Sequence, residues 1–123
     1  MSIEWIMVND KELTATLYNS NITLNKSSSY YFDSAYKVIV GMDISNRQIL
    51  IKHLSKEESI RGNIDKNNLL DIKIKPSYGR ISSRKVMSEI EKTFKLDFSN
   101  HLKFQAYWDN TTKMLKIHLD EVI

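Results

Sequence analysis

The stretch YKVIVGMDISNRQILIKHL, residues 36–54, has the clearest strand pattern in the first half of the sequence. It contains two apolar runs rich in Val and Ile, and the polar residues DISNR separate them. Two such runs around a short polar turn are typical of a β-hairpin. A second stretch, LKFQAYWDNTTKMLKIHL at residues 102–119, has the same order of apolar run, Asp, polar turn and apolar run ending in His-Leu. The sequence therefore predicts two similar hairpins.

The segments before the two hairpins also follow a common order. Residues 13–17 and 22–24 alternate apolar and polar side chains, and residues 69–75 and 80–82 do the same, which predicts a pair of short strands in each half. A short helix is expected at about 26–32. A clearer helix is expected at about 83–95, where Val86, Met87, Ile90 and Phe94 share one helical face.

These patterns predict a single domain over residues 1–123 that is mainly β (α+β). Repeat one covers about 13–54, a polar linker or surface loop about 55–67, and repeat two about 69–119. Residues 38–40 and 49–51 are apolar on both faces of their strands and need cover on both sides. Two β-β-α-β-β repeats that close around a pseudo-twofold axis into a barrel supply that cover and leave few open edges.

The composition excludes several classes of protein. A chain of 123 residues has the length of one domain. It has no cysteine, which excludes disulfides and thiolate metal sites. No apolar run reaches the length of about 18 residues needed to cross a membrane, so we expect no membrane association. The opening MSIEWIMVND lacks the pattern of a secretion signal and is predicted as an edge strand of a cytoplasmic protein.

Catalytic and metal-binding patterns are absent from the sequence. It has only three glycines and no phosphate-binding loop, and no Ser lies in a Gly-flanked nucleophile turn. His53 and His118 occupy similar positions near strand ends but have no third ligand at a suitable spacing. We therefore expect no enzyme activity, no cofactor and no metal. The aromatic runs at residues 30–32 and 107–108 are expected to pack in the core, with a protein-binding surface as the alternative.

The positive charge is concentrated in the second half of the chain. Residues 1–61 contain seven basic and seven acidic side chains, whereas residues 73–95 contain seven basic side chains against Glu89 and Glu91. Such an excess attracts polyanions. The segment KIKPSYGRISSRK surrounds a predicted turn and helix start, so we expect it to contact DNA phosphates and base edges. The predicted DNA-binding residues are Lys73, Lys75, Tyr78, Arg80, Arg84 and Lys85.

The stretches NITLNKSSSYYF and GRISSRKVMSEI, each followed by its hairpin, resemble the AbrB, MazE and MraZ group of swapped-hairpin barrels. The resemblance covers about residues 13–119, and two copies in one chain look like the MraZ arrangement. It implies an intramolecular pseudo-dimer and a bacterial DNA-binding regulator. In that group basic residues around the first hairpin and the following turn face DNA. The Gly-Arg that precedes the strand is present in the second copy as Gly79-Arg80.

Two functional hypotheses follow. The first is a small DNA-binding regulator from a bacterium or mobile element, because the bias toward Ile, Lys, Asn and Ser is typical of an AT-rich genome. The second is a non-enzymatic, anti-CRISPR-like inhibitor from a phage or mobile element that binds a host defence protein or nucleoprotein. A homo-oligomer is compatible with both.

Overall fold

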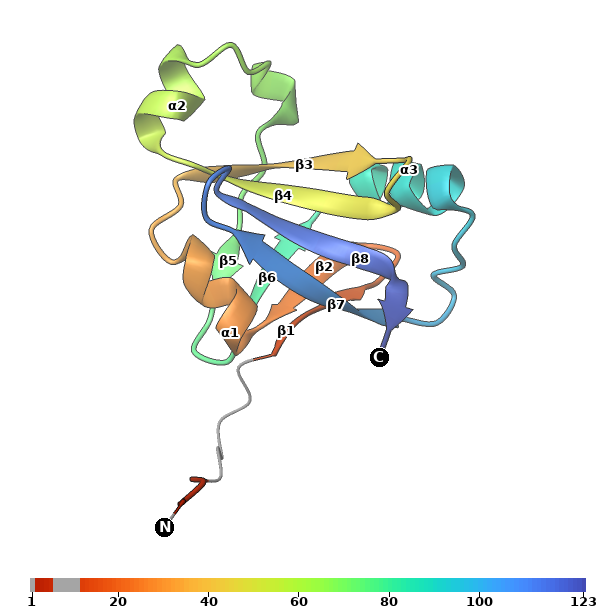
Figure 1. Cartoon of the computed structure of the whole chain (residues 1–123). Coiled ribbons are helices and arrows are strands. Elements are labelled where there is room, and N and C mark those ends of the chain that lie inside the picture. Colours follow the sequence, from red (N-terminus) through yellow and green to blue (C-terminus); the bar gives the residue numbers. More distant parts are fainter. Residues whose placement is uncertain (1, 6–11) are drawn as a thin grey trace.

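The computed structural model describes residues 2–5 and 12–123. Its described strands form one antiparallel sheet of eight strands in the order β3-β4-β8-β7-β1-β2-β6-β5 (Figure 1). The strands are β1 (Leu13–Leu17), β2 (Asn21–Asn25), β3 (Lys37–Asp43), β4 (Gln48–Leu54), β5 (Lys73–Ile74), β6 (Tyr78–Ser82), β7 (Leu102–Asp109) and β8 (Met114–Val122). The helices are α1 (Lys26–Ser29), α2 (Lys56–Arg61) and α3 (Arg84–Phe94), with short 3-10 turns η1 (Tyr30–Phe32) and η2 (Lys66–Asn68).

The prediction of a mainly β protein is confirmed, as are both predicted helices. The clear helix at about 83–95 is α3, which begins after Ser83, whose hydroxyl accepts a hydrogen bond from the N–H of Val86 at 3.2 Å. The short helix at about 26–32 is α1 followed by η1. Local capping and turn signals therefore place these helices correctly.

Two expectations differ from the structure or lie partly outside it. The segment predicted as a polar linker, residues 55–67, contains α2 and the start of η2. Here Ser55 and Glu58 form a reciprocal cap, in which each side chain accepts the other residue's backbone N–H. Of the predicted N-terminal edge strand, residues 2–5 lie in no strand, and residues 1 and 6–10 are outside the described part. No helix of the described residues is long and apolar enough to cross a membrane.

The sheet curls so that its two edge strands approach each other (Figure 1). Leu70, in the segment leading to β5, exchanges two backbone hydrogen bonds of 2.9 Å with Val38 of β3. This contact is a single bridge, and beyond it β3 and β5 separate. The described part of the chain is therefore a strongly curled, half-closed barrel.

The core fills the concave side of the sheet and draws on both halves of the chain. α3 contributes Met87, Ile90 and Phe94, and the largest fully buried side chains include Phe32 and Phe104. The fully or almost fully buried apolar side chains of the strands are Ala15, Leu17, Ile22, Leu24, Val38, Ile49, Ile51, Leu54, Ile81, Phe104, Ala106, Leu115, Ile117 and Leu119. Apart from Leu54, these residues belong to one continuous apolar cluster.

The β3–β4 turn is stabilised by a carboxylate. Asp43 accepts hydrogen bonds from the side chain of Asn46 at 2.8 Å and from its backbone N–H at 3.2 Å. These bonds, the side-chain one first, lower the pKa of Asp43. The turn ends at Arg47, whose φ of 51° is left-handed.

The β7–β8 turn is built in the same way. Asp109 accepts hydrogen bonds from the N–H groups of Thr111 at 2.9 Å and Thr112 at 3.3 Å, and it pairs with Lys116 at 3.2 Å. The bond from Lys116, followed by that from the Thr112 backbone, lowers the pKa of Asp109. This turn ends at Lys113 with a φ of 58°.

Two glycines make a matched test of packing. A Cβ on Gly79 would lie 2.9 Å from the Cβ of Ser29 and 3.2 Å from Cδ1 of Ile74, whereas a Cβ on Gly41 meets nothing within 4 Å. We expect Gly79→Ala to lower the free energy of unfolding by about 1–3 kcal/mol, the usual cost of overpacking. Gly41→Ala should leave it unchanged or raise it by up to about 1 kcal/mol. Urea denaturation followed by circular dichroism measures both, and equal effects would contradict this packing.

The lowered pKa of Asp43 predicts an acid-dependent contribution to stability. Because its folded pKa lies below the unfolded value of about 3.9, the charged side chain stabilises the native state above that value. The contribution is lost as the pH falls through the folded pKa. Asp43→Asn keeps an oxygen that accepts the Asn46 N–H but removes the titration. Its melting temperature should therefore fall less between pH 4 and pH 2 than that of the unchanged protein, and parallel curves would refute the assignment.

Candidate nucleic-acid interface

One convex surface of the sheet consists only of polar and aromatic side chains. We call this surface the outer face, and it comprises the outward side chains of β5, β6, β2, β1 and the part of β7 that pairs with β1. These residues are Lys73, Tyr78, Arg80, Ser82, Asn21, Thr23, Asn25, Thr16, Lys103 and Gln105, whereas Thr14 on the same side of β1 is buried. None of them is Asp or Glu. The face is therefore free of the carboxylates that would repel a polyanion.

The strand register arranges part of this face as a single row. Lys73 lies opposite Arg80, and Arg80 lies opposite Thr23 on its other side. Thr23 lies opposite Thr16, which lies opposite Lys103. Four strand spacings of about 4.8 Å separate the ends of the row, so Lys73 and Lys103 are at most about 19 Å apart along the sheet. The row thus has cations at both ends, Lys73 and Arg80 at one end and Lys103 at the other. The hydroxyl groups of the two threonines lie between them.

The cations of this row are available to a ligand. The guanidinium carbon of Arg80 lies 5.1 Å from the ring centre of Tyr78, which stands on the same face of β6. Such a cation–π contact orients the guanidinium without neutralising it. Lys73, Arg80 and Lys103 are exposed and form no ion pair within residues 2–5 and 12–123.

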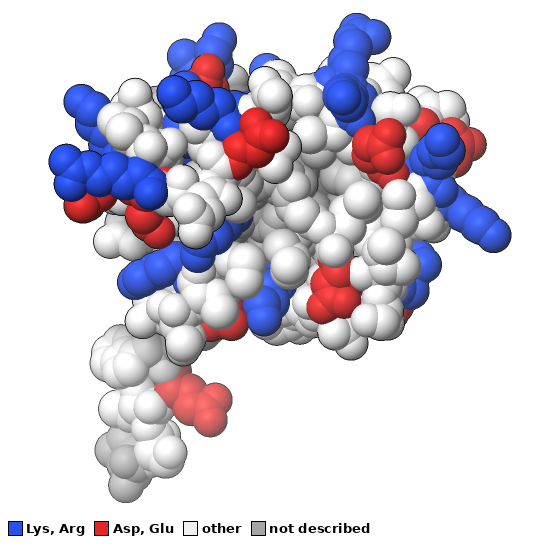
Figure 2. Space-filling view, turned by 90° about the horizontal axis from the view of Figure 1, so that it is seen from above, with Lys and Arg blue, Asp and Glu red and all other residues white. Residues whose placement is uncertain are grey.

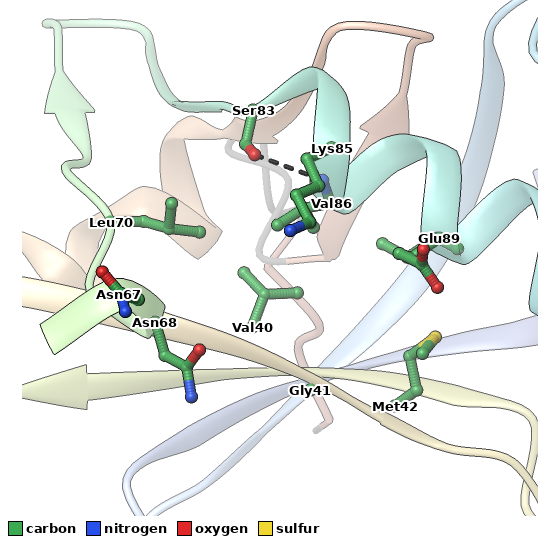
Figure 3. Close-up of a pocket in the computed structure, with 11 residues that line it drawn as sticks. Val40, Gly41, Met42, Asn67, Asn68, Leu70, Ser83, Lys85, Val86 and Glu89 are labelled. Carbon is green, nitrogen blue, oxygen red and sulfur yellow. Dashed lines mark hydrogen bonds between the residues drawn. The ribbon is translucent and has the colours of Figure 1, made fainter. Parts of the chain in front are cut away.

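The six residues predicted from the sequence do not all lie on this face. Lys73, Tyr78 and Arg80 belong to it, and Lys75 is exposed just beyond β5, where its N–H bonds the carbonyl of Tyr78 at 2.8 Å. Arg84 is exposed at the first residue of α3. Lys85 instead lines a groove between α3 and β3 (Figure 3). The structure therefore gathers four of the six near the β5–β6 hairpin and directs Lys85 elsewhere.

Sequence reasoning missed the part of the face that comes from the first half and from β7. Thr23 joins the row through the pairing of β2 with β6, and Thr16 and Lys103 join it through the pairing of β1 with β2 and β7. The alternation in LTATL and NITLN indicates which side chains share a face, but the neighbouring strand is not a local property. The acid-free character of the face therefore emerges only when distant strands are brought together.

The two aromatic runs of the sequence meet at a separate place. Tyr31 stacks on Trp108 with ring centres 4.5 Å apart, and Phe32 contacts Trp108 edge-on at 5.6 Å. Phe32 is fully buried, whereas Tyr30 is 75% exposed. The expectation of core packing is thus confirmed for Phe32, while Tyr30 lies on the surface.

The two histidines are not close neighbours. His118 is opposite Gln48 at one end of β4, and His53 is near the other end, opposite Val38. No group of three or more His, Cys, Asp or Glu side chains suited to a metal ion occurs among the described residues.

Comparison with protein-family models, with curated proteins and with solved structures finds no match to this chain.

Proposed function

We propose that this protein is a small DNA-binding regulator of a bacterium or mobile element and that its outer face binds DNA. The observation that carries the proposal is the row from Lys73 through Arg80, Thr23 and Thr16 to Lys103, on a face without carboxylates. Cations supply the attraction to phosphates, and Thr, Ser and Asn side chains are common donors to phosphate oxygens.

The dimensions of the row suit a duplex. Its length of about 19 Å, measured along the curved sheet, is comparable with the major-groove width of about 12 Å, so the long side chains at its two ends suit phosphates on both sides of a groove. Arg80 stands next to the middle of the row and is suited to a guanine edge, with Lys73 and Lys103 as phosphate contacts.

We extend the proposal to the predicted duplication, which the strand order supports. The Leu70–Val38 bridge joins the two edges of the sheet, so the strand order can be read as a closed ring. If each strand of the first half is exchanged with its counterpart in the second half (β1 with β5, β2 with β6, β3 with β7 and β4 with β8), every strand keeps the same neighbours in this ring. Ile22 lies opposite Ile81, with Asn21 opposite Ser82 and Thr23 opposite Arg80 on either side. This register suits a pseudo-twofold axis between the two isoleucines.

The hairpin turns support the same relation at single residues. Asp109 and Lys113 each lie 66 positions after their counterparts Asp43 and Arg47 (109 − 43 and 113 − 47), and Lys113 and Arg47 both have a left-handed backbone. The N–H of Leu119 bonds the carbonyl of Arg47 at 3.0 Å, and the N–H of His53 bonds that of Lys113 at 3.0 Å. His53 thus corresponds to Leu119 under this offset, one position from the match with His118 that the sequence had suggested.

A twofold-related protein surface suits the twofold symmetry of a DNA duplex, as in regulators that bind palindromic sites. The duplicated order also supports the resemblance to the AbrB, MazE and MraZ group. In this proposal one chain supplies both halves of the barrel, and the outer face surrounds the axis between β2 and β6.

The outer face predicts a specific loss of DNA affinity. The protein should bind a fluorescein-labelled duplex in fluorescence anisotropy, with an affinity that falls steeply as salt rises. Arg80→Ala should weaken binding about tenfold, and Lys73→Ala should lower the slope of log affinity against log salt by about 0.9. Lys56→Ala, on α2 and away from the face, is the matched control. An Arg80→Ala variant with unchanged affinity would reject this surface.

A charge placed in the middle of the row tests the face independently. Thr23→Glu puts a carboxylate beside Arg80 on the partly exposed side of β2, where repulsion of phosphates should reduce DNA affinity at least tenfold. Thr23→Gln has a similar size without the charge and should bind DNA nearly as the unchanged protein does. Equal affinities for the two variants would show that position 23 does not face DNA.

The surface aromatics favour a second candidate function, the anti-CRISPR-like inhibitor that binds a host defence protein. Tyr30 is 75% exposed and adjoins the stacked pair of Tyr31 and Trp108. Tyr and Trp are frequent anchors of protein interfaces. Absence of DNA binding at low salt, combined with loss of partner capture on Tyr30→Ala, would favour this candidate.

A further inference from the structure

A groove of about 340 Å³ separates β3 from α3 (Figure 3). Its apolar lining consists of Val40 and Met42 of β3, Leu70, and Val86 and Ile90 of α3. Asn67, Asn68, Lys85 and Glu89 supply polar groups along it. Figure 2, which looks at the molecule from above Figure 1, shows uncharged atoms over the middle of this side and charged side chains to both sides.

The wall of the groove on the β3 side is a free sheet edge. β3 is the last strand of the sheet, and Val38 turns its N–H and carbonyl away from β4 to bond Leu70. Backbone groups two residues apart in a strand point to the same side, so those of Val40 and Met42 also point away from β4 and toward the groove. Within the described residues no strand pairs with this part of the edge.

The same chain carries a segment suited to such an edge. Ile3 is 64% exposed and Trp5 is 85% exposed, and they alternate with the polar residues Ser2 and Glu4. Trp5 is the most exposed large apolar side chain of the described residues. A strand with this alternation has one apolar face and one polar face.

We propose that residues 2–5 of a second copy of this chain add as a strand to the free edge of β3, and that two copies exchange these segments. The N–H and carbonyl groups of Val40 and Met42 supply the main-chain hydrogen bonds, as in other cases of strand addition. Ile3 and Trp5 enter the groove toward Leu70, Val86 and Ile90, and Glu4 faces water beside Gly41. Because each copy both gives and receives a segment, the assembly closes as a dimer.

The oligomeric state of the full chain tests this proposal. Sedimentation velocity between 5 and 200 µM should show a dimer, and Trp5→Ser should raise its dissociation constant at least tenfold. Val40→Pro should have the same effect, because proline removes an N–H that faces the groove rather than β4. Tyr30→Ser, which removes another highly exposed aromatic ring, is the control and should leave the dimer intact.

The absence of native cysteines permits a direct test of the contact. Gly41 has open space for a new side chain, so a Glu4→Cys chain mixed with a Gly41→Cys chain should form a disulfide-linked heterodimer under mild oxidation. Ser45→Cys, in the β3–β4 turn, is the control and should cross-link far more slowly. A monomer at all concentrations would overturn the proposal, as would a dimer unaffected by Trp5→Ser and Val40→Pro. A monomer with Trp5 buried against its own groove would also overturn the exchange between copies.

Discussion

The pairing of β2 with β6 holds β6 and β5 in the sheet. It joins the two halves of the chain, with Ile22 opposite Ile81. On the inner side this ladder buries Ile22, Leu24 and Ile81 in the core. A shift of one residue would turn these side chains to water and bring Arg80 inside, so the apolar core fixes the register strongly. The same register places Arg80 beside Thr23 and thereby creates the row of the outer face.

The outer face and the groove use different parts of the sheet. The outer face lies on the convex side of β5, β6, β2, β1 and the start of β7, whereas the groove lies along the open edge of β3 beside α3. Exchange of N-terminal segments at β3 therefore leaves the outer face uncovered. The proposed dimer has two outer faces, and under the proposed function two linked sites gain affinity when both reach one duplex.

Local features of the sequence predict much of this fold. The apolar face of α3 and the Ser83 cap are properties of consecutive residues, as are the Asp-led turns after β3 and β7. α2 was not predicted because its residues form little apolar face, although Ser55 and Glu58 provide a capping sequence at its start. The Leu70–Val38 bridge was also missed because it joins residues far apart in the chain, and neither residue indicates its partner.

The candidate site was predicted only in part for a similar reason. Lys73 and Arg80 follow strand alternation, so their common face can be inferred from the sequence. Lys85 follows helical geometry after the Ser83 cap, and this turns it toward β3 rather than toward the hairpin. Thr16 and Lys103 are neighbours on the outer face only because β7 pairs with β1, and this pairing joins strands that are far apart in the sequence.

An NMR titration of the isotope-labelled protein with duplex DNA tests directly whether the outer face binds DNA. We expect the amide signals of β5, β6, β2, β1 and the start of β7 to shift together, with the largest changes around Thr23 and Arg80. Shifts confined to α2 or to the aromatic cluster around Trp108, or no shifts at low salt, would contradict it.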